Sequence, residues 1–198
     1  MIEDKERFDK AIRRFDEINR QDPRLEFSNG QEHPKELLYA QRMTEGLRRF
    51  APDAPEEVQL AARCQHIKRW HIPRNTYPQG RRGYKSWRSD LLQFHAGIAS
   101  RILSECGYEE EIIFRVKALL TKENLKRDPD VQLLEDVICL VFLEHYFQDF
   151  ASEHSEEKLV RILQKTWKKM SPAGHAAALA LDLPPNTKQI VTNALSES

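Results

Sequence analysis

The side chains best suited to chemistry lie in one basic and aromatic stretch in the first half of the chain. Between Glu57 and Asp90 the sequence holds no acidic residue. The basic side chains of this stretch are Arg63, Lys68, Arg69, Arg74, Arg81, Arg82, Lys85 and Arg88, with His66 and His71 among them. The interleaved aromatic side chains are Trp70, Tyr77, Tyr84 and Trp87. Arginine offers planar, bidentate donors to phosphate or carboxylate, and aromatic rings offer stacking faces, so the stretch predicts an anion site.

A structural interpretation of the same stretch stays open, because arginine and tryptophan also brace long loops through ion pairs and cation–π contacts. Backbone amides near Gly80 and Gly83, at the start of the following helix, would add anion donors. The candidate ligand-binding residues are Arg69, Trp70, Arg74, Tyr77, Arg82, Tyr84, Trp87 and Arg88.

Two histidines and one aspartate are the candidates for proton transfer. The candidate catalytic residues, which would also be the ligands of any divalent metal, are His66, His95 and Asp136. A neutral imidazole can bind a metal, transfer a proton or form hydrogen bonds in a core. No His-x-x-x-His or His-Glu-x-x-His spacing occurs, so the local sequence carries no metal signature. A structural role is the alternative, with Glu135 and Asp136 paired to Arg63 or Arg69.

Helical periodicity dominates the elements that must position these residues, and no hairpin dipeptide separates two alternating apolar runs. The stretch from 71 to 83 is expected to be a long connection, because Pro73, Pro78, Gly80 and Gly83 interrupt the pattern. The sixth helix is expected to be buried, since its centre at 137–143 is apolar all round. The expected helices are 8 to about 22, 34–50, 55–70, 84–106, 109–122, one opening at 129, 155–170, and short ones beyond 171.

These patterns predict an all-α fold, a single-domain helical bundle. A length of 198 residues favours one domain with a sizeable core. We expect a helical core domain over residues 1–170 and a C-terminal short-helix extension over 171–198.

Charge and composition restrict the classes of partner. The chain has 31 Lys and Arg against 31 Asp and Glu, and a net charge of zero argues against coating nucleic acid or anionic membrane. No apolar run reaches about 18 residues, and the charged N-terminus does not match a signal peptide, so no membrane partner is expected. The three cysteines are far apart in sequence, which favours reduced thiols and a cytoplasmic location.

Two segments carry a resemblance to a known family. The segments RCQHIKRWHIPRNTYPQGRRGYKSWRSDLLQFHA (63–96) and LLTKENLKRDPDVQLLEDVICLVFLEHYFQDFA (119–151) resemble the uncharacterised family named domain of unknown function 4202. The resemblance covers the chain to about residue 151 and implies no established reaction. The positions that match the family's pattern are His66, Arg69, Pro73, Arg74, Tyr77, Arg82, Tyr84, Trp87, Arg88, His95, Lys122, Glu135 and Asp136.

A more distant likeness is to the helical scaffold of HD-domain metal-dependent phosphohydrolases, which implies a degenerate HD-like arrangement. The usual metal ligands are replaced in this chain. Tyr39 stands at the first histidine position, Gln65-His66 replaces the His-Asp pair, and Ile138 stands at the last aspartate position. The usual two-metal site is therefore not expected, although His66, His95 and Asp136 could form a rearranged one.

Three functional hypotheses follow from these residues. The first is a protein that binds a phosphorylated or otherwise anionic small molecule, a nucleotide included, in a cationic and aromatic pocket. The second is a phosphohydrolase that uses a divalent metal with a non-standard ligand set. The third, less favoured, is an RNA- or protein-interaction module that presents the same stretch as an exposed surface. A structural helical adaptor is the alternative without a site. The sequence leaves the oligomeric state open.

Overall fold

The computed structural model describes residues 2–185, 188 and 190–191, and it forms two compact units, Met1–Asn124 and Leu125–Ser198. The first unit contains α1 (Lys5–Asn19), β1 (Leu25–Ser28), β2 (Gln31–Pro34), α2 (Lys35–Phe50), α3 (Glu56–Cys64), the 3-10 turns η1 (Arg69–His71) and η2 (Arg74–Thr76), α4 (Gly80–Glu105) and α5 (Glu110–Thr121). The second contains α6 (Pro129–His145), α7 (Phe147–Ser152), α8 (Glu156–Trp167) and α9 (Pro172–Leu179). The predicted all-α fold is confirmed. The predicted boundary at residue 170 differs from this division and stays a prediction.

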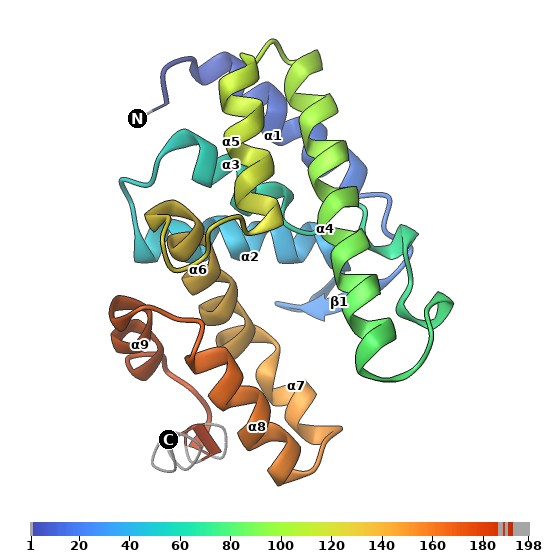
Figure 1. The fold of residues 1–198 in the computed structure, drawn as a ribbon, viewed down its shortest axis with the longest axis vertical. Helices are drawn as coiled ribbons and strands as arrows, with labels where there is room; N and C mark the ends of the chain where they lie inside the picture. The colour runs from blue at the N-terminus through green and yellow to red at the C-terminus, as the bar shows by residue number, and fades with distance from the viewer. Residues whose placement is uncertain (1, 186–187, 189, 192–198) are drawn as a thin grey trace. The chain divides into compact units, whose positions relative to one another are not determined.

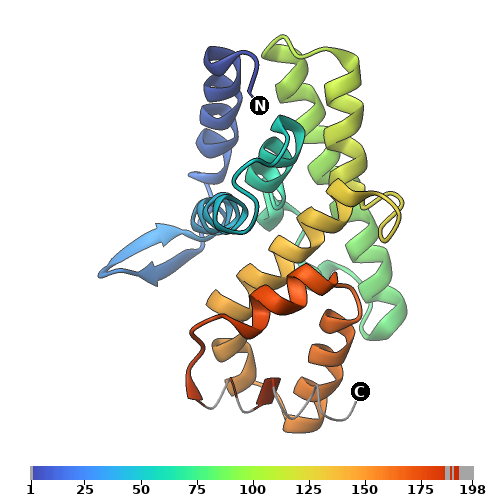
Figure 2. The ribbon, with the colours of Figure 1, turned by 90° about the vertical axis from the view of Figure 1, so that its left-hand side faces the viewer.

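The core of the first unit forms where α3 packs between α1, α2 and α5, while α4 packs along α5 (Figures 1 and 2). Asp4 caps α1 by accepting a hydrogen bond from the amide of Arg7, at 2.9 Å. The inward stripe of α1 includes Phe8, Ala11 and Phe15, as its apolar periodicity predicts. Fully buried side chains from the other elements include Met43, Leu60, Ile67, Leu91, Ile102 and Leu119.

The second unit is built on α6. Asp128 accepts hydrogen bonds from the amides of Asp130 and Val131, and Pro129 occupies the first helical turn, so the predicted cap is confirmed. Val137, Val141 and Leu143 are buried, as the apolar centre of the helix predicts. The last helix expected near the C-terminus falls largely outside the described residues.

A β-hairpin between α1 and α2 is absent from the sequence-based prediction. β1 pairs antiparallel with β2 through the turn Asn29-Gly30, where both residues have positive φ. The Asn-Gly dipeptide is a typical signal for this turn. The apolar pattern alone does not predict these strands, because β2 is polar throughout and β1 exposes its apolar positions, with Phe27 72% exposed.

Two predicted helix boundaries next to the basic stretch were wrong. The third helix ends at Cys64 rather than Trp70, and turns closed by i+3 bonds, such as that from the amide of Ile67 to the carbonyl of Cys64, follow it. Lys68 then takes a left-handed conformation, and its amide donates to the side-chain oxygen of Asn19 at 3.0 Å. The fourth helix begins at Gly80 rather than Tyr84. The connection between them, 65–79, is therefore where the chain turns from α3 to α4.

Candidate functional site

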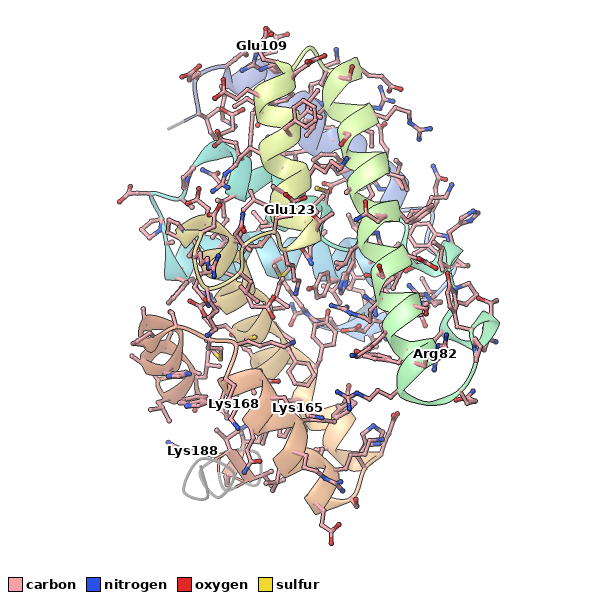
Figure 3. The ribbon with its side chains drawn as sticks, in the orientation of Figure 1. Arg82, Glu109, Glu123, Lys165, Lys168 and Lys188 are labelled. Atoms are coloured by element: carbon pink, nitrogen blue, oxygen red, sulfur yellow. The ribbon has the colours of Figure 1, made fainter. Side chains whose placement is uncertain are left out.

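The structure separates the predicted basic and aromatic residues into an exposed group and a partly buried group. Arg81, Arg82 and Lys85 are exposed on the first turns of α4, and Tyr84 on the same turns is 50% exposed. Figure 3 shows Arg82 at this end of the helix. His66 and Arg69 lie instead in the connection and are partly buried, while Trp87 and Arg88 lie one turn further along α4, where Trp87 is buried and Arg88 is partly buried. Trp70 is half-buried on the 3-10 turn η1.

Two members of the stretch hold the connection in place. Arg74 donates to the carbonyl oxygens of Tyr77 and Pro78, both at 2.9 Å. The hydroxyl of Tyr77 donates to a carboxylate oxygen of Asp90 at 2.8 Å. Arg74 and Tyr77 therefore have structural roles, as the bracing interpretation expected of part of this stretch.

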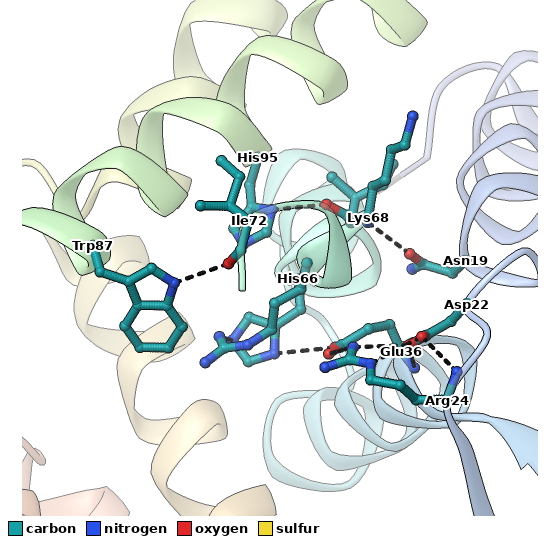
Figure 4. A network of polar contacts seen from close by, with 11 residues as sticks. Asn19, Asp22, Arg24, Glu36, His66, Lys68, Ile72, Trp87 and His95 are labelled. Atoms are coloured by element: carbon teal, nitrogen blue, oxygen red, sulfur yellow. Dashed lines mark hydrogen bonds and ion pairs between the residues drawn. The ribbon is translucent and has the colours of Figure 1, made fainter. Parts of the chain in front are cut away.

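A network of acidic and basic side chains from the segment between α1 and β1 and from α2 leads to His66 (Figure 4). Arg24 donates to Asp22 through two nitrogens, at 2.9 and 3.0 Å, and to Glu36 at 2.7 Å. Asp22 also accepts from the amide of Glu36 at 3.1 Å, which anchors the start of α2. Both carboxylates are about 3% exposed and therefore require such partners. Burial raises the pKa of Glu36, and the charges of Arg69 and Arg24 oppose that rise.

His66 lies against three side chains, two from α2 and one from the 3-10 turn η1. Its Nδ1 lies 3.4 Å from a carboxylate oxygen of Glu36, and its Nε2 lies 2.9 Å from a guanidinium nitrogen of Arg69. The ring of Tyr39 stacks on it, with centroids 4.1 Å apart and planes at 14°. Since a guanidinium can only donate, Nε2 accepts from Arg69 and the neutral ring carries its hydrogen on Nδ1, toward Glu36.

The electrostatics around His66 are dominated by positive charge. Burial lowers its pKa well below the usual value, and four cations lower it further: Arg69, Arg88, Lys122 and Arg24. Arg69 also lies over the ring of Trp87, 5.1 Å from its centroid, and the indole nitrogen of Trp87 donates to the carbonyl of Ile72 at 2.9 Å. His66 is therefore a neutral imidazole held among cations, and its side chain is 18% exposed.

His95 is the second predicted histidine near this network. Its Nδ1 hydrogen-bonds with the carbonyl of Ile67 at 2.8 Å, and its ring centroid is 5.9 Å from that of His66. Since a carbonyl can only accept, Nδ1 carries the hydrogen and Nε2 carries the lone pair. That Nε2 is buried and has no hydrogen-bond partner among the described residues. Burial lowers the pKa of His95 to about 3, so the ring is neutral at physiological pH.

Asp136, the third predicted catalytic residue, has structural contacts within the second unit. It accepts hydrogen bonds from the amide and hydroxyl of Ser171, at 2.8 and 2.5 Å, and from Gln132 at 3.1 Å. Ser171 in turn caps α9 by accepting from the amide of Gly174. Among the residues that the structure describes, no arginine forms a hydrogen bond or ion pair with Asp136, so the alternative in which it pairs with Arg63 or Arg69 is not met. Arg63 instead binds Asp16 through two hydrogen bonds of 2.7 Å.

Glu135, the residue before Asp136, is buried, and its carboxylate lies 3.5 Å from the ammonium nitrogen of Lys169.

In the part of the chain that the structure describes, no group of three or more His, Cys, Asp or Glu side chains is arranged to hold a metal ion. The described helices also include none with the length and apolar character needed to cross a membrane.

The sequence reasoning missed three residues outside the acid-free stretch that complete this network: Asp22, Arg24 and Glu36. Tyr39 and Lys122 were noted only through the family resemblances and were not assigned to the site. A signal for Glu36 was present, because it lies seven positions before Met43 on the inward stripe of its helix. A buried carboxylate on such a stripe implies a buried cationic or hydrogen-bonding partner.

Comparison with known proteins gives one match. The family model described as "Domain of unknown function (DUF4202)" matches residues 9–191. The match extends beyond residue 151, where the sequence resemblance was expected to end, so the C-terminal segment up to 191 is part of the family's pattern. Neither the curated proteins nor the solved structures give a significant match. The chain therefore belongs to the DUF4202 family.

Proposed function

We propose that the first unit binds a small, doubly negative ligand of the phosphomonoester class beside His66. The observation that carries this proposal is the local excess of positive charge. Four cations, Arg69, Arg88, Lys122 and Arg24, act on His66. Arg24 is paired with the carboxylates of Asp22 and Glu36, whereas no carboxylate of the described residues forms a hydrogen bond or ion pair with Arg69 or Arg88. With His66 neutral, a dianion would balance the two guanidinium charges of Arg69 and Arg88, and phosphomonoesters are dianionic near neutral pH.

Arg88 supports a ligand site over a purely structural network. It is half-buried on α4, next to Trp87, and makes no hydrogen bond or ion pair with any residue that the structure describes. Arg24 already engages both carboxylates, and its pairing is bidentate with Asp22. Arginine matches phosphate oxygens with paired donors, and a partly buried site strengthens such bonds. We therefore assign Arg69 and Arg88 as the principal anion-binding residues.

Thermal denaturation with a panel of inorganic phosphate, nucleoside monophosphates and sugar phosphates tests the proposal. A specific ligand at a hundredfold excess over its dissociation constant stabilises the fold by about 2.7 kcal/mol. Arg88→Gln should abolish the shift. The matched control is Arg81→Gln, the same change at an exposed position of the same helix, which should leave it intact. Absence of a shift with every phosphate compound, or equal shifts in both variants, contradicts the proposal.

The exposed residues at the start of α4 support a second candidate function, RNA binding. Arg81, Arg82 and Lys85 lie within three positions of the half-exposed Tyr84 and are themselves exposed, and single-stranded nucleic-acid surfaces combine cations with stacking faces in this way. RNA binding on this surface would weaken steeply with salt and would be lost in Arg81→Gln and Arg82→Gln. Binding that is flat between low and moderate salt argues against it.

Metal-dependent hydrolysis and the HD-like arrangement stay predictions from sequence. Elemental analysis of the purified protein, with His66→Ala as the comparison, tests the first of them. We also propose a cytoplasmic location, which the three buried free thiols of Cys64, Cys106 and Cys139 support.

A further inference from the structure

His66 is held in a single orientation by contacts on both ring nitrogens and on one face. Glu36 lies at Nδ1, Arg69 at Nε2, and Tyr39 is stacked on the ring. The Nδ1 hydrogen faces a carboxylate, an arrangement that stabilises the imidazolium formed when Nε2 takes up a proton. The lone pair that would accept this proton points at the guanidinium of Arg69, 2.9 Å away.

The hydrogen bond from Arg69 therefore occupies that lone pair, and it can be broken when another acceptor competes for the guanidinium. Its bond to His66 joins a charged donor to a neutral acceptor, whereas bonds from arginine to a phosphate dianion join opposite charges and are bidentate. A bound dianion competes for the same donors and should draw the guanidinium toward itself. An oxygen that takes the place of the Arg69 nitrogen would lie about 2.6–3.2 Å from Nε2, the range for proton transfer.

We propose that Glu36 and His66 form a proton-accepting pair, and that Arg69 covers its lone pair until a bound anion draws the guanidinium away. In the step assigned to this pair, a hydroxyl of the phosphorylated ligand, or a water beside it, gives its proton to Nε2 of His66. The electrons of the O–H bond remain on that oxygen. Nδ1 keeps its hydrogen, and the carboxylate of Glu36 balances the new charge. His66 is the group that touches the reacting atoms, and Glu36 is a positioning residue.

This inference rests on the proposed anion site, so its test separates the two. The first measurement needs no ligand: the rate at which diethyl pyrocarbonate, which attacks unprotonated imidazole, modifies His66, followed by peptide mass spectrometry. Arg69→Met removes the donor and should raise this rate about tenfold, the effect of one net hydrogen bond. Arg81→Met is the matched control and should leave it unchanged. The exposed His71 provides the reference rate within each sample.

The second measurement uses the wild-type chain with inorganic phosphate, and records the ¹⁵N resonances of the His66 ring. Without phosphate, the ring should be the neutral tautomer with hydrogen on Nδ1. Phosphate should shift Nε2 as its bond to Arg69 is replaced. Glu36→Gln should reduce the fraction of the Nδ1-hydrogen tautomer, an effect that a merely structural Glu36 would not produce.

Each outcome decides one of the two proposals. Phosphate binding without a change in the Nε2 resonance contradicts the proposal that Arg69 blocks the lone pair of His66 until an anion binds. The anion site itself would still stand. An unchanged rate of His66 modification in Arg69→Met contradicts the same proposal. If phosphate and the phosphate compounds of the thermal panel all fail to bind, the anion site fails, and the ligand-driven release of His66 fails with it.

Discussion

Burial of the neutral His95 ring should make the first unit less stable as the pH falls. The pKa of His95 is about 3 in the folded chain against 6.5 in the unfolded one, because desolvation disfavours the charged form. Between these values the unfolded chain binds more protons than the folded one, so the free energy of unfolding falls as the pH falls. The contribution of His95 is complete above pH 6.5 and is lost progressively below it.

The size of this loss follows from the two pKa values. At pH 5.5, one unit below the unfolded value, a single such histidine costs about 1.4 kcal/mol relative to neutral pH. At pH 4.5 the cost is about 2.7 kcal/mol. His66, whose pKa is also lowered by burial, adds a cost of the same sign. The raised pKa of Glu36 acts in the opposite direction above the unfolded carboxyl value, so the comparison requires a variant that removes His95 alone.

Urea denaturation at pH 7.5 and 5.5 measures the loss, with His95→Gln as the variant that stays neutral at both. A Trp167→Phe background leaves Trp70 and Trp87, both in the first unit, as the fluorescent reporters. Wild type should lose about 1.4 kcal/mol more than the variant between the two pH values. Equal losses would refute the reasoning. A direct ¹H NMR titration of His95 gives the same answer without the variant, because the ring should remain neutral at pH 5.

Two further predictions concern packing in each unit. A Cβ at position 83 would overlap the carbonyl oxygen of Pro78, so Gly83→Ala should destabilise the first unit by about 1–3 kcal/mol in the same urea assay. Gly97 has open space around it, so Gly97→Ala should stabilise α4 by about 0.5–1 kcal/mol. Asp136→Ala should lower the stability of the second unit by about 2–4 kcal/mol, because it leaves the amide of Ser171 without its acceptor and weakens the start of α9. Trp167 fluorescence reports that loss, and an unchanged denaturation midpoint would contradict the structural role of Asp136.

The helices could be predicted because their signals are local. Apolar residues three and four positions apart predicted α1, α2 and α6, and the sequence Asp128-Pro129 predicted the start of α6 correctly. The end of α3 could not be predicted in this way. The left-handed turn at Lys68 is accompanied by a hydrogen bond to Asn19, which is 49 positions away in the sequence. Local propensity carries no information about such a partner.

Part of the candidate site could be predicted because, like helical periodicity, the clustering of charge is a local signal in the sequence. The acid-free stretch identified Arg69, Trp87 and Arg88, together with His66, because clustering by charge is visible along the chain. It also included Arg74, which the fold uses to bind backbone carbonyls of the connection. Which arginine faces a histidine and which holds a loop depends on the path of the connection.

The sequence by itself determined the helical class, the family and the position of the basic stretch, since each depends on residue types and their spacing. Only the tertiary structure decided that Glu36 and Arg69 meet on His66, because Glu36 comes from α2 whereas His66 and Arg69 come from the turns after α3. It also decided that Asp136 is bound to Ser171 in the second unit. The physical reason is that hydrogen bonds and burial depend on distances in space, which the spacing of residues along a chain does not fix.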